Sequence, residues 1–245
     1  MPKTILFIGA TGGCVLSTLQ RSLAAGHTCI ALCRTPSNLN SKLTPAEQSA
    51  VHITQGNAHD ASALRGALTV SSAAQPTLVD YVISGIGNPV TKEGILHPDN
   101  DVCRRGMETL LGAVAGLRAE GVGGRVRILG ISSTGVSDFG RDIPFAMIPL
   151  YKVMLHVPHK DKKGMEDLLI ASGEEWTVVR PSWLTNGEGG VTEVRAGMED
   201  PERKEVVTKA VGYTISREDV GKWIFDNVVE EADGKWVKRI ASLTY

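Results

Sequence analysis

A glycine-rich turn near the amino terminus constrains the fold more than any other feature of the sequence. It occupies Gly9–Cys14, with the sequence GATGGC, and follows the apolar run Thr4–Ile8. Leu16, Leu19 and Leu23 recur at helical spacing directly after it, so the pattern predicts a strand, a tight turn and a helix. The free N–H groups and the positive dipole end of such a helix face the turn, where an anion binds. The pattern therefore favours a nucleotide-phosphate site over a plain strand-to-helix turn.

The glycines of this turn have a physical purpose, because they let the backbone bend sharply and approach a diphosphate closely. A third glycine of such a fingerprint normally permits close packing between helix and strand. Val15 stands at that position, so we expect it to widen the helix–strand contact or to shift the loop, while binding survives. The residues expected to contact a cofactor here are Gly9, Thr11, Gly12, Gly13, Cys14 and Val15.

Apolar runs and helical patterns alternate along the rest of the chain, and most of the runs are apolar on both faces. Strands of this kind are typical of a parallel sheet buried between helices. We therefore predict an α/β fold, a Rossmann-like doubly wound parallel sheet. Further strands are predicted at His27–Cys33, Val51–Thr54, Leu78–Ser84, Arg125–Ile131, Trp176–Val179 and Trp236–Ile240, and helices at Asp101–Glu120 and Arg217–Glu230.

The predicted domain organisation is simple. We expect one NAD(P)-binding domain over residues 1–245, with a small carboxyl-terminal substrate-side region formed by residues 181–216. Within that region Gly187–Lys204 is polar and rich in Gly and Glu. We expect it to be a long inserted loop that acts as a mobile substrate lid.

Composition excludes several functional classes. The net charge of −1 over 245 residues gives no basic surface for nucleic acid, which needs clustered Lys and Arg. No apolar stretch approaches the ~20 residues that span a bilayer, and Met1–Lys3 leads straight into a strand-like run. Four cysteines without a CxxC pair indicate reduced thiols and no metal site. We expect a cytoplasmic protein without nucleic-acid or membrane partners, whose oligomeric state stays open.

The end of the second strand distinguishes between the two nicotinamide cofactors. NAD sites usually carry an acid there, whereas an arginine nearby accommodates the 2′-phosphate of NADP. The sequence ALCRTPS at 31–37 has no acid but has Arg34, followed by Thr35 and Ser37. A guanidinium clamps a phosphate through two parallel hydrogen bonds. We therefore expect NADP(H), with Arg34 at its 2′-phosphate.

The third strand leads into a segment that we expect beside the adenine. This segment is Gly56–Asp60, with the sequence GNAHD. The Asn57 amide is suited to hydrogen-bond the adenine edge, and Ala58 is predicted beside it. We expect Asp60 to cap the following helix, since Asp is a preferred N-cap residue.

Six motifs together resemble one family. They are GATGG at 9–13, ALCR at 31–34, YVISGIG at 81–87, ILGISSTG at 128–135, DKKGMEDLLIASGEEWTVVRPSWLTNG at 161–187 and ISREDVGKWI at 215–224. The chain resembles the atypical short-chain dehydrogenase/reductases, in particular the NmrA-like and biliverdin-reductase-B-like group. The resemblance covers most of the chain and is not specific for a substrate. It implies that Ser84, Gly85 and Ile86 lie beside the cofactor ribose and that Pro181, Ser182, Trp183 and Leu184 cover the nicotinamide.

The same resemblance points to Lys162 as the lysine that holds the nicotinamide ribose and lowers the pKa of a tyrosine acid. The tyrosine expected four residues earlier is absent, because Pro158 stands there. His159 is next to it and precedes Lys163 by four residues, which leaves the register open. A histidine has a pKa suited to proton transfer near neutral pH, so His159 is a candidate acid.

Other candidate catalytic residues surround this segment. Tyr151 and His156 are alternative proton donors. Ser132 and Ser133 end the fifth predicted strand, where the family polarises its substrate; we expect Ser133 to be catalytic and Ser132 to contact the cofactor. Trp183 is a candidate wall of the substrate pocket.

Two residues near the carboxyl end have a structural interpretation. Arg217 and Asp219 lie at the start of the last predicted helix, and we expect them to form a local ion pair.

The functional prediction is an NADPH-dependent oxidoreductase that transfers hydride to a small conjugated or aromatic acceptor, such as a carbonyl, a quinone or a flavin. Such acceptors draw a proton from water or a nearby His, so the missing tyrosine is tolerated. The missing acid also fits an alternative, a non-catalytic NADP(H)-binding redox sensor that acts through a protein partner. A third hypothesis is that the protein is a secondary-metabolism isomerase or cyclase on the same fold.

Overall fold

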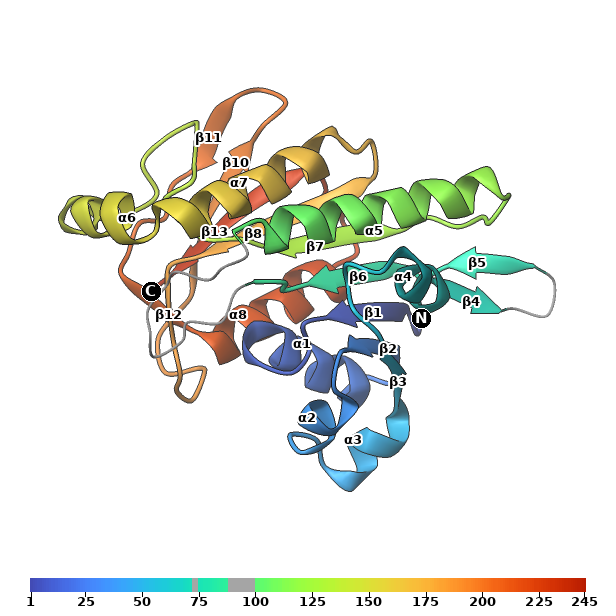
Figure 1. The fold of residues 1–245 in the computed structure, drawn as a ribbon. Helices are drawn as coiled ribbons and strands as arrows, with labels where there is room; N and C mark the ends of the chain where they lie inside the picture. Colours follow the sequence, from blue (N-terminus) through green and yellow to red (C-terminus); the bar gives the residue numbers. More distant parts are fainter. Residues whose placement is uncertain (72–74, 88–99) are drawn as a thin grey trace.

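The computed structural model describes residues 1–71, 75–87 and 100–245, and its largest element is a nine-stranded sheet (Figure 1). In spatial order the strands are β11 (Glu205–Thr208), β10 (Arg195–Asp200), β13 (Arg239–Thr244), β8 (Glu175–Pro181), β7 (Arg127–Ile131), β6 (Tyr81–Ser84), β1 (Thr4–Ile8), β2 (Thr28–Cys33) and β3 (Val51–Gln55). Two smaller pairs are β9 (Trp183–Thr185) with β12 (Thr214–Ser216), and β4 (Thr69–Ser71) with β5 (Pro76–Leu78).

Strand direction and order make this a doubly wound sheet. Every neighbouring pair from β13 to β3 is parallel, whereas β10 is antiparallel to both β13 and β11. The chain runs from β1 outward to β2 and β3 and then returns to β6 on the other side of β1. Ligands of such sheets bind at the carboxyl ends of the strands where the order reverses. The Rossmann-like fold predicted from the sequence is confirmed, and β1 and β6 flank the expected crevice.

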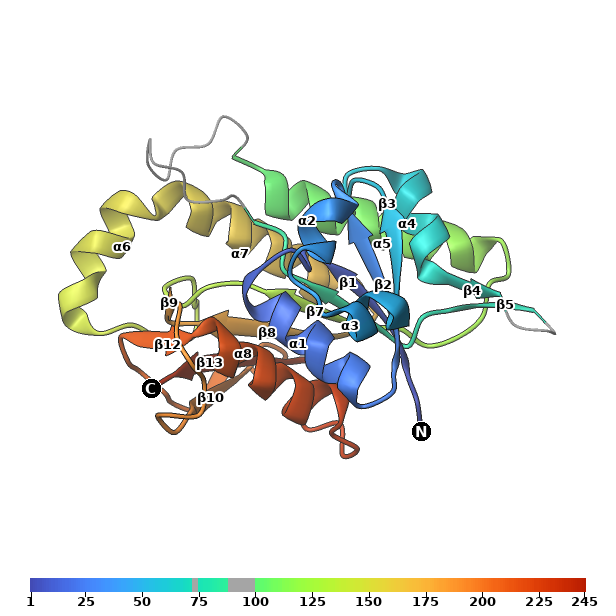
Figure 2. The same cartoon turned by 90° about the horizontal axis from the view of Figure 1, so that it is seen from below.

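Helices cover both faces of the sheet. One face carries α1 (Gly13–Ala24), α8 (Arg217–Ile224) and the π-helical turn η2 (Phe225–Val229), and the other carries α4 (Ala61–Leu68), α5 (Val102–Ala119) and α7 (His156–Ala171). Figure 2 shows α1 and α8 side by side. The remaining elements are α2 (Pro36–Asn40), α3 (Pro45–Ala50), the 3₁₀ turn η1 (Phe145–Met147) and α6 (Ile148–Met154). Each face buries its own apolar cluster, so the strands are apolar on both sides.

Most predicted elements are present within a few residues of their expected bounds, and Asp60 caps α4 through hydrogen bonds from the N–H groups of Ser62 and Ala63. Two strand predictions were wrong in extent. The run Leu78–Ser84 is broken between β5 and β6, because Asp80 turns to accept a hydrogen bond from the Thr4 N–H. The last strand begins at Arg239 and not at Trp236.

The physical reason for the late start of β13 lies in the residues before it. Lys238 has a φ of 54°, which a strand does not allow. Trp236 is buried in the preceding turn, where its ring meets that of Trp223 edge-on at 4.8 Å between centroids. Trp236 is thus a buried apolar residue outside the strand, which explains why the sequence pattern predicted a strand that begins there.

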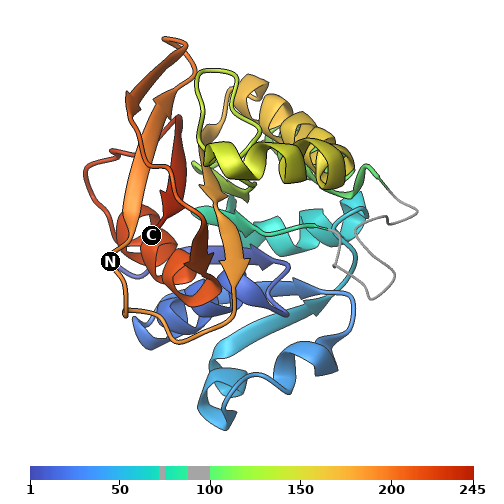
Figure 3. The same cartoon turned by 90° about the vertical axis from the view of Figure 1, so that its left-hand side faces the viewer.

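The predicted lid at Gly187–Lys204 was wrong for its second half. Residues 195–200 form β10, which joins the main sheet beside β13. Figure 3 shows the orange hairpin of β10 and β11 at the opposite edge of the sheet from the blue strands. The segment was read as a loop because Glu199 and Asp200 are polar, yet both are buried beside basic partners, Arg180 and Arg239. A strand whose charged residues form buried ion pairs is therefore not recognised from its hydropathy pattern.

None of the helices within the described residues is both long and apolar enough to cross a bilayer. The four cysteines are unpaired and buried, in agreement with the reduced thiols that we expect. Burial raises the pKa of the Cys14 thiol to about 12, so this residue is a neutral thiol at physiological pH.

Candidate functional site

A cleft of about 1170 Å³ lies at the carboxyl ends of β1, β2 and β6, where the strand order reverses. Its wall combines the glycine loop with residues from the ends of neighbouring strands and from α7 and α8. This is the position at which doubly wound sheets bind dinucleotides. The predicted cofactor residues that line it are Gly9, Thr11, Gly12, Gly13, Cys14, Val15, Arg34, Asn57, Ala58, Gly85, Ile86, Ser132, Lys162 and Leu184.

The glycine loop leaves the amino end of α1 open to the cleft. Gly12 is the N-cap of α1, and no side chain caps the helix. Gly9 and Gly13 have φ angles of +85° and +61°, which side chains other than glycine rarely adopt. A Cβ at Gly9 would lie 3.1 Å from the carbonyl oxygen of Gly85. The turn therefore brings glycine backbone and the uncapped amino end of α1 to the cleft, as a phosphate cradle requires.

Val15 packs against a glycine on the facing strand end. A Cβ added at Gly85, just after β6, would lie 2.5 Å from Cγ2 of Val15. The methyl group of Val15 thus fills the volume that Gly85 leaves empty. At this contact the small residue therefore lies on the strand side and the branched residue on the helix side.

The Gly85→Ala variant is expected to lose about 1–3 kcal/mol of unfolding free energy, because the new methyl group overpacks against Val15. Urea unfolding measures this loss. Adding Val15→Ala should recover most of it, since the pair shares one volume. Gly112→Ala in α5 is the matched control, because nothing lies within 4 Å of a Cβ at Gly112. Equal stability of Gly85→Ala and the wild type would contradict the packing described above.

Among the described residues, cations but no carboxylates line the cleft. Arg34 lies at the end of β2 with an exposed side chain, Lys162 projects from α7 and Arg217 from the start of α8. Lys42, which follows α2, donates a hydrogen bond from Nζ to the Thr11 carbonyl and so reaches the glycine loop from the side of Arg34. The electrostatic character of the cleft is thus positive, which favours a polyanionic ligand.

Lys162 is held in the cleft by carbonyl groups at or just beyond the ends of two strands. Its Nζ donates to the carbonyl oxygens of Ile86 and Ile131, at 2.7 Å each. An ammonium group has three N–H donors, so one remains for a ligand. The lysine therefore bridges the ends of β6 and β7 and presents its charge between them.

The neighbour of Lys162 fixes the position of α7. The buried Asp161 carboxylate accepts hydrogen bonds from the backbone N–H groups of Cys103 and Arg104, at 2.9 and 2.8 Å. These are N–H groups of the first turn of α5, whose N-cap Asp101 makes no side-chain cap. Asp161 of α7 thus caps the amino end of α5, and this contact sets the register of α7 against α5.

The two serines after β7 have different surroundings. Ser132 is buried, lines the cleft, and its hydroxyl has no hydrogen-bond partner within the described residues. Ser133 is half-buried and donates its hydroxyl to the Thr134 carbonyl at 3.1 Å. Ser84 is buried at the end of β6 behind the cleft wall, and its hydroxyl is also unpaired in the described part of the chain. Of these three serines, Ser132 is therefore the one that lines the cleft together with Lys162.

The segment expected to cover the nicotinamide meets the cleft at one residue. Leu184 lines it, whereas Pro181 and Ser182 are buried within the sheet and Trp183 is 43% exposed on β9. The Ser182 hydroxyl donates to Thr244 at 3.0 Å. The sequence alone does not show which of these four residues reaches the cleft, because strand residues alternate between faces.

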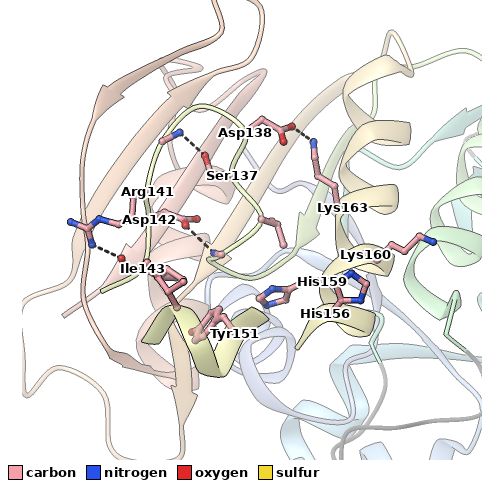
Figure 4. A pocket seen from close by; sticks show the side chains of 14 residues that line it. Ser137, Asp138, Arg141, Asp142, Ile143, Tyr151, His156, His159, Lys160 and Lys163 are labelled. Carbon is pink, nitrogen blue, oxygen red and sulfur yellow. Dashed lines mark hydrogen bonds and ion pairs between the residues drawn. The ribbon is translucent and has the colours of Figure 1, made fainter. Parts of the chain in front are cut away.

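Tyr151 and His159 lie together in a second cavity of about 440 Å³ (Figure 4). Their rings are in contact at a tilt of 55°, with 5.3 Å between centroids. The cavity is walled by the loop after β7, by α6 and by one face of α7 that also carries His156 and Lys163. It shares no lining residue with the dinucleotide cleft in the described part of the chain.

The pKa argument made for His159 is wrong. Burial, with a smaller contribution from nearby His156, lowers the pKa of His159 to about 4, so the ring is neutral near pH 7. Burial also raises the pKa of Tyr151, a rise that a hydrogen bond with Thr134 partly opposes. The sequence suggested a titrating histidine because it could not show that α6 covers the ring.

His159 should make stability depend on pH. Because its pKa is lowered from 6.5 to about 4, the unfolded chain binds the proton more tightly, and stability is lost as the pH falls through this window. The free energy of unfolding of the wild type relative to His159→Gln should fall by about 2–3 kcal/mol between pH 6.5 and 4. Urea unfolding at several pH values measures it.

The comparison with His159→Gln is needed because a second group acts in the opposite direction. Burial raises the pKa of Asp142 from 3.8 to about 6, so its contribution favours the folded state at low pH and is lost as the pH rises. The two effects offset each other in the wild type. A wild-type minus variant difference that does not change with pH would contradict the lowered pKa of His159.

The expected ion pair between Arg217 and Asp219 was wrong. Arg217 binds the Leu184 carbonyl and the Asn186 side chain, whereas Asp219 accepts hydrogen bonds from Ser216 and Tyr245. Ala10, Thr35 and Gly87, which belong to segments expected beside the cofactor, also line the cleft. Sequence reasoning gave no cofactor contact to its other lining residues, because it selected single positions within each motif. These are Ile8, Leu32, Cys33, Asn38, Gly56, His59, Val102, Ile131 and Arg217. The described residues contain no cluster of His, Cys, Asp or Glu that would hold a metal ion.

Comparison with known proteins identifies the family. The family model described as NAD(P)H-binding matches residues 9–231. The chain belongs to the NAD(P)H-binding family. Reductase pytE of Aspergillus terreus is 36% identical over 265 residues, covering 99% of this chain and 98% of pytE. Oxidase pynE of Aspergillus niger is 33% identical over 281 residues, covering 98% of each chain.

A solved structure supports the same assignment at the level of the fold. A short-chain dehydrogenase/reductase of Veillonella parvula in complex with NADP has a TM-score of 0.72 and 18% identity, over 100% of this chain and 95% of that one. The NAD(P)-binding family membership expected from the motifs is confirmed, and the fold is shared with a short-chain dehydrogenase/reductase. This member of the NAD(P)H-binding family is an oxidoreductase.

Proposed function

We propose that the protein is an NADPH-dependent reductase of a small conjugated or aromatic acceptor. The observation that carries the cofactor choice is the charge of the cleft. Its charged lining residues are Arg34, Lys162 and Arg217, and no Asp or Glu lines it within the described chain. A site for NAD carries an acid at the end of the second strand, where this chain has Arg34.

The residues present fit a dinucleotide with an additional phosphate. The amino end of α1 and the glycine backbone at Gly9 and Gly13 suit a diphosphate. Arg34 is exposed at the end of β2, and Lys42 reaches the glycine loop on the same side. These two cations suit the 2′-phosphate. Asn57 and Ala58 lie farther along this side of the cleft and suit the adenine.

The opposite end of the cleft holds the groups that would act in the reaction. A reduced nicotinamide, when bound, supplies the hydride. Lys162 keeps one N–H for a ribose hydroxyl and places a positive charge where an acceptor gains electron density. The Ser132 hydroxyl is the nearby group suited to an acceptor oxygen or the nicotinamide amide.

The acceptor class follows from the candidate acids that, within the described residues, do not line the cleft beside Lys162. Pro158 stands one helical turn earlier and has no proton to give, and His159 and Tyr151 line the other cavity. A conjugated acceptor such as a quinone spreads the added charge and takes its proton from water. The names reductase and oxidase of the two Aspergillus relatives support hydride chemistry.

The direct test follows NADPH oxidation with a panel of quinones, flavins and aromatic ketones. We expect turnover with NADPH and slower turnover with NADH. Tight NADPH binding without turnover across the panel would contradict the acceptor class, whereas failure to bind either nucleotide would contradict the dinucleotide site.

The Arg34→Met variant tests the choice of cofactor. We expect NADPH to bind about 10- to 100-fold more weakly, because a charge-assisted pair with the 2′-phosphate is lost, and NADH to bind unchanged. Titration calorimetry with both nucleotides measures this. Arg125→Met is the control, because Arg125 pairs with Glu175 at the far end of the strands. An equal loss for NADPH and NADH would contradict the role of Arg34.

A further inference from the structure

Arg217 is a cation of the cleft to which the proposed reaction assigns no role. It is the first residue of α8 and lies against the glycine loop. A Cβ built at Gly13 would lie 3.2 Å from Cδ of Arg217 and 3.6 Å from its Nε. Gly13 is the first residue of α1, the helix whose amino end has no side-chain cap. The Arg217 side chain therefore crosses the loop at the point where a diphosphate would bind.

One edge of the guanidinium is already occupied. Its Nη1 donates to the Leu184 carbonyl at 3.2 Å and to Oδ1 of Asn186 at 2.8 Å. Its Nε and Nη2 have no partner among residues 1–71, 75–87 and 100–245. An arginine presents its donors in a planar fork that matches two phosphate oxygens. The free edge is thus suited to a phosphate, while the occupied edge holds the chain after β9.

The position of Arg217 is fixed by the packing of α8 on α1. Thr18 Oγ1 donates to the Gly221 carbonyl at 3.2 Å. A Cβ at Gly221 would lie 2.4 Å from Cβ of Ser17, so the two helices touch at their backbones. Glu218 forms an ion pair with Arg21 at 2.5 Å and is therefore directed away from Arg217. Helix α1, which supplies the anion site, and helix α8, which supplies Arg217, are therefore packed directly against each other.

The start of α8 also holds the far end of the same segment. Asp219 accepts a hydrogen bond from the Gly190 N–H at 2.7 Å and another from the Tyr245 hydroxyl at 2.5 Å. Residues 184–190 are therefore bound at one end by Arg217 and at the other by Asp219. This segment reaches the cleft at Leu184, on the side proposed for the nicotinamide.

We propose that Arg217 binds the diphosphate of NADP(H) through its free edge and thereby couples cofactor binding to the ordering of residues 184–190. Arg217 is a positioning residue in this role: it joins the cofactor to the wall of the acceptor site. The proposal rests on the proposed function, because it requires a dinucleotide in the cleft. The sequence predicted an ion pair between Arg217 and Asp219; the proposal instead gives Arg217 a contact with a ligand.

The binding test compares three nucleotides, of which two contain the diphosphate and one lacks it. They are NADPH, 2′-phospho-ADP-ribose, which keeps the diphosphate but lacks the nicotinamide, and adenosine 2′-monophosphate, which lacks the diphosphate. For Arg217→Met we expect affinity for the first two to fall about 10- to 100-fold and affinity for the third to be unchanged. Arg217→Lys should recover part of the loss, because it keeps the charge but not the fork.

Hydrogen exchange of residues 184–190 tests the coupling. In the wild type, NADPH should slow exchange of this segment, whereas saturating NADPH should leave it unprotected in Arg217→Met. Lys222→Met is the matched control on the same helix, because Lys222 pairs with Asp226 on the surface. It should behave as the wild type in both measurements.

The outcomes separate this inference from the proposed function. If the wild type binds none of the nucleotides, the dinucleotide site itself is wrong. If the wild type binds NADPH and Arg217→Met binds it equally well, the assignment of Arg217 is overturned while the proposed function stands. An equal loss for all three nucleotides would also overturn it, because that result indicates a disturbed adenosine site and not a lost diphosphate contact.

Discussion

Arg180→Met is expected to destabilise the protein by about 3–5 kcal/mol, because it leaves buried carboxylates without their counter-charge. The Arg180 side chain is 1% exposed and donates to both oxygens of Glu166, at 2.9 and 2.6 Å, and to Glu199 at 2.7 Å. These contacts join α7, β8 and β10 inside the protein. Urea unfolding of the variant measures the loss.

Two further variants show whether unpaired charge is the cause. Adding Glu166→Gln and Glu199→Gln to Arg180→Met should recover much of the stability, since the charges that lost their partner are then removed. Arg125→Met, which breaks an exposed pair with Glu175, should cost less than about 1 kcal/mol. A loss for Arg180→Met as small as that of the control would contradict this account of the network.

Lys162→Met is expected to lower kcat by about 100- to 1000-fold, the range found when a preorganised charge is removed from the reacting end of a site. The Nζ group bridges the carbonyl oxygens of Ile86 and Ile131, so no other described cation replaces it there. Steady-state rates with NADPH and the best quinone of the panel measure the effect. Lys162→Arg should retain part of the rate, because it keeps a positive charge at the same helix position.

The neighbouring lysine is the matched control and resolves the register that the sequence left open. Lys163 forms ion pairs with Asp138 and Asp167, at 2.6 Å each, and faces the second cavity (Figure 4). Lys163→Met should therefore leave kcat nearly unchanged. A large loss in Lys163→Met together with an active Lys162→Met would reverse the assignment and place the reaction in the second cavity.

Much of the cleft could be predicted from local patterns. The glycine loop and the strand end at Arg34 are each a few consecutive residues whose geometry follows from strand, turn and helix. Sequence spacing also brings Lys162 and Asp161 onto one segment. It does not show that Asp161 caps α5 or that Lys162 reaches two strand ends, because both depend on how α7 packs.

The remaining features depend on contacts between distant segments. Arg217 and Lys42 reach the glycine loop from parts of the chain that carry no motif for it. The strand β10 was hidden because Glu199 is polar, and a hydropathy pattern cannot reveal the arginine that neutralises it. His159 was assigned an ordinary pKa because its burial comes from the packing of α6 and the loop after β7.

The contact between Val15 and Gly85 has a consequence for how such sequences vary. The two positions share a volume that holds one side chain, so a gain of bulk at either must be matched by a loss at the other. Among natural variants of this chain, positions 15 and 85 should therefore change together and not independently. A search that scores only the third glycine of the fingerprint would discard functional members in which the small residue has moved to the facing strand.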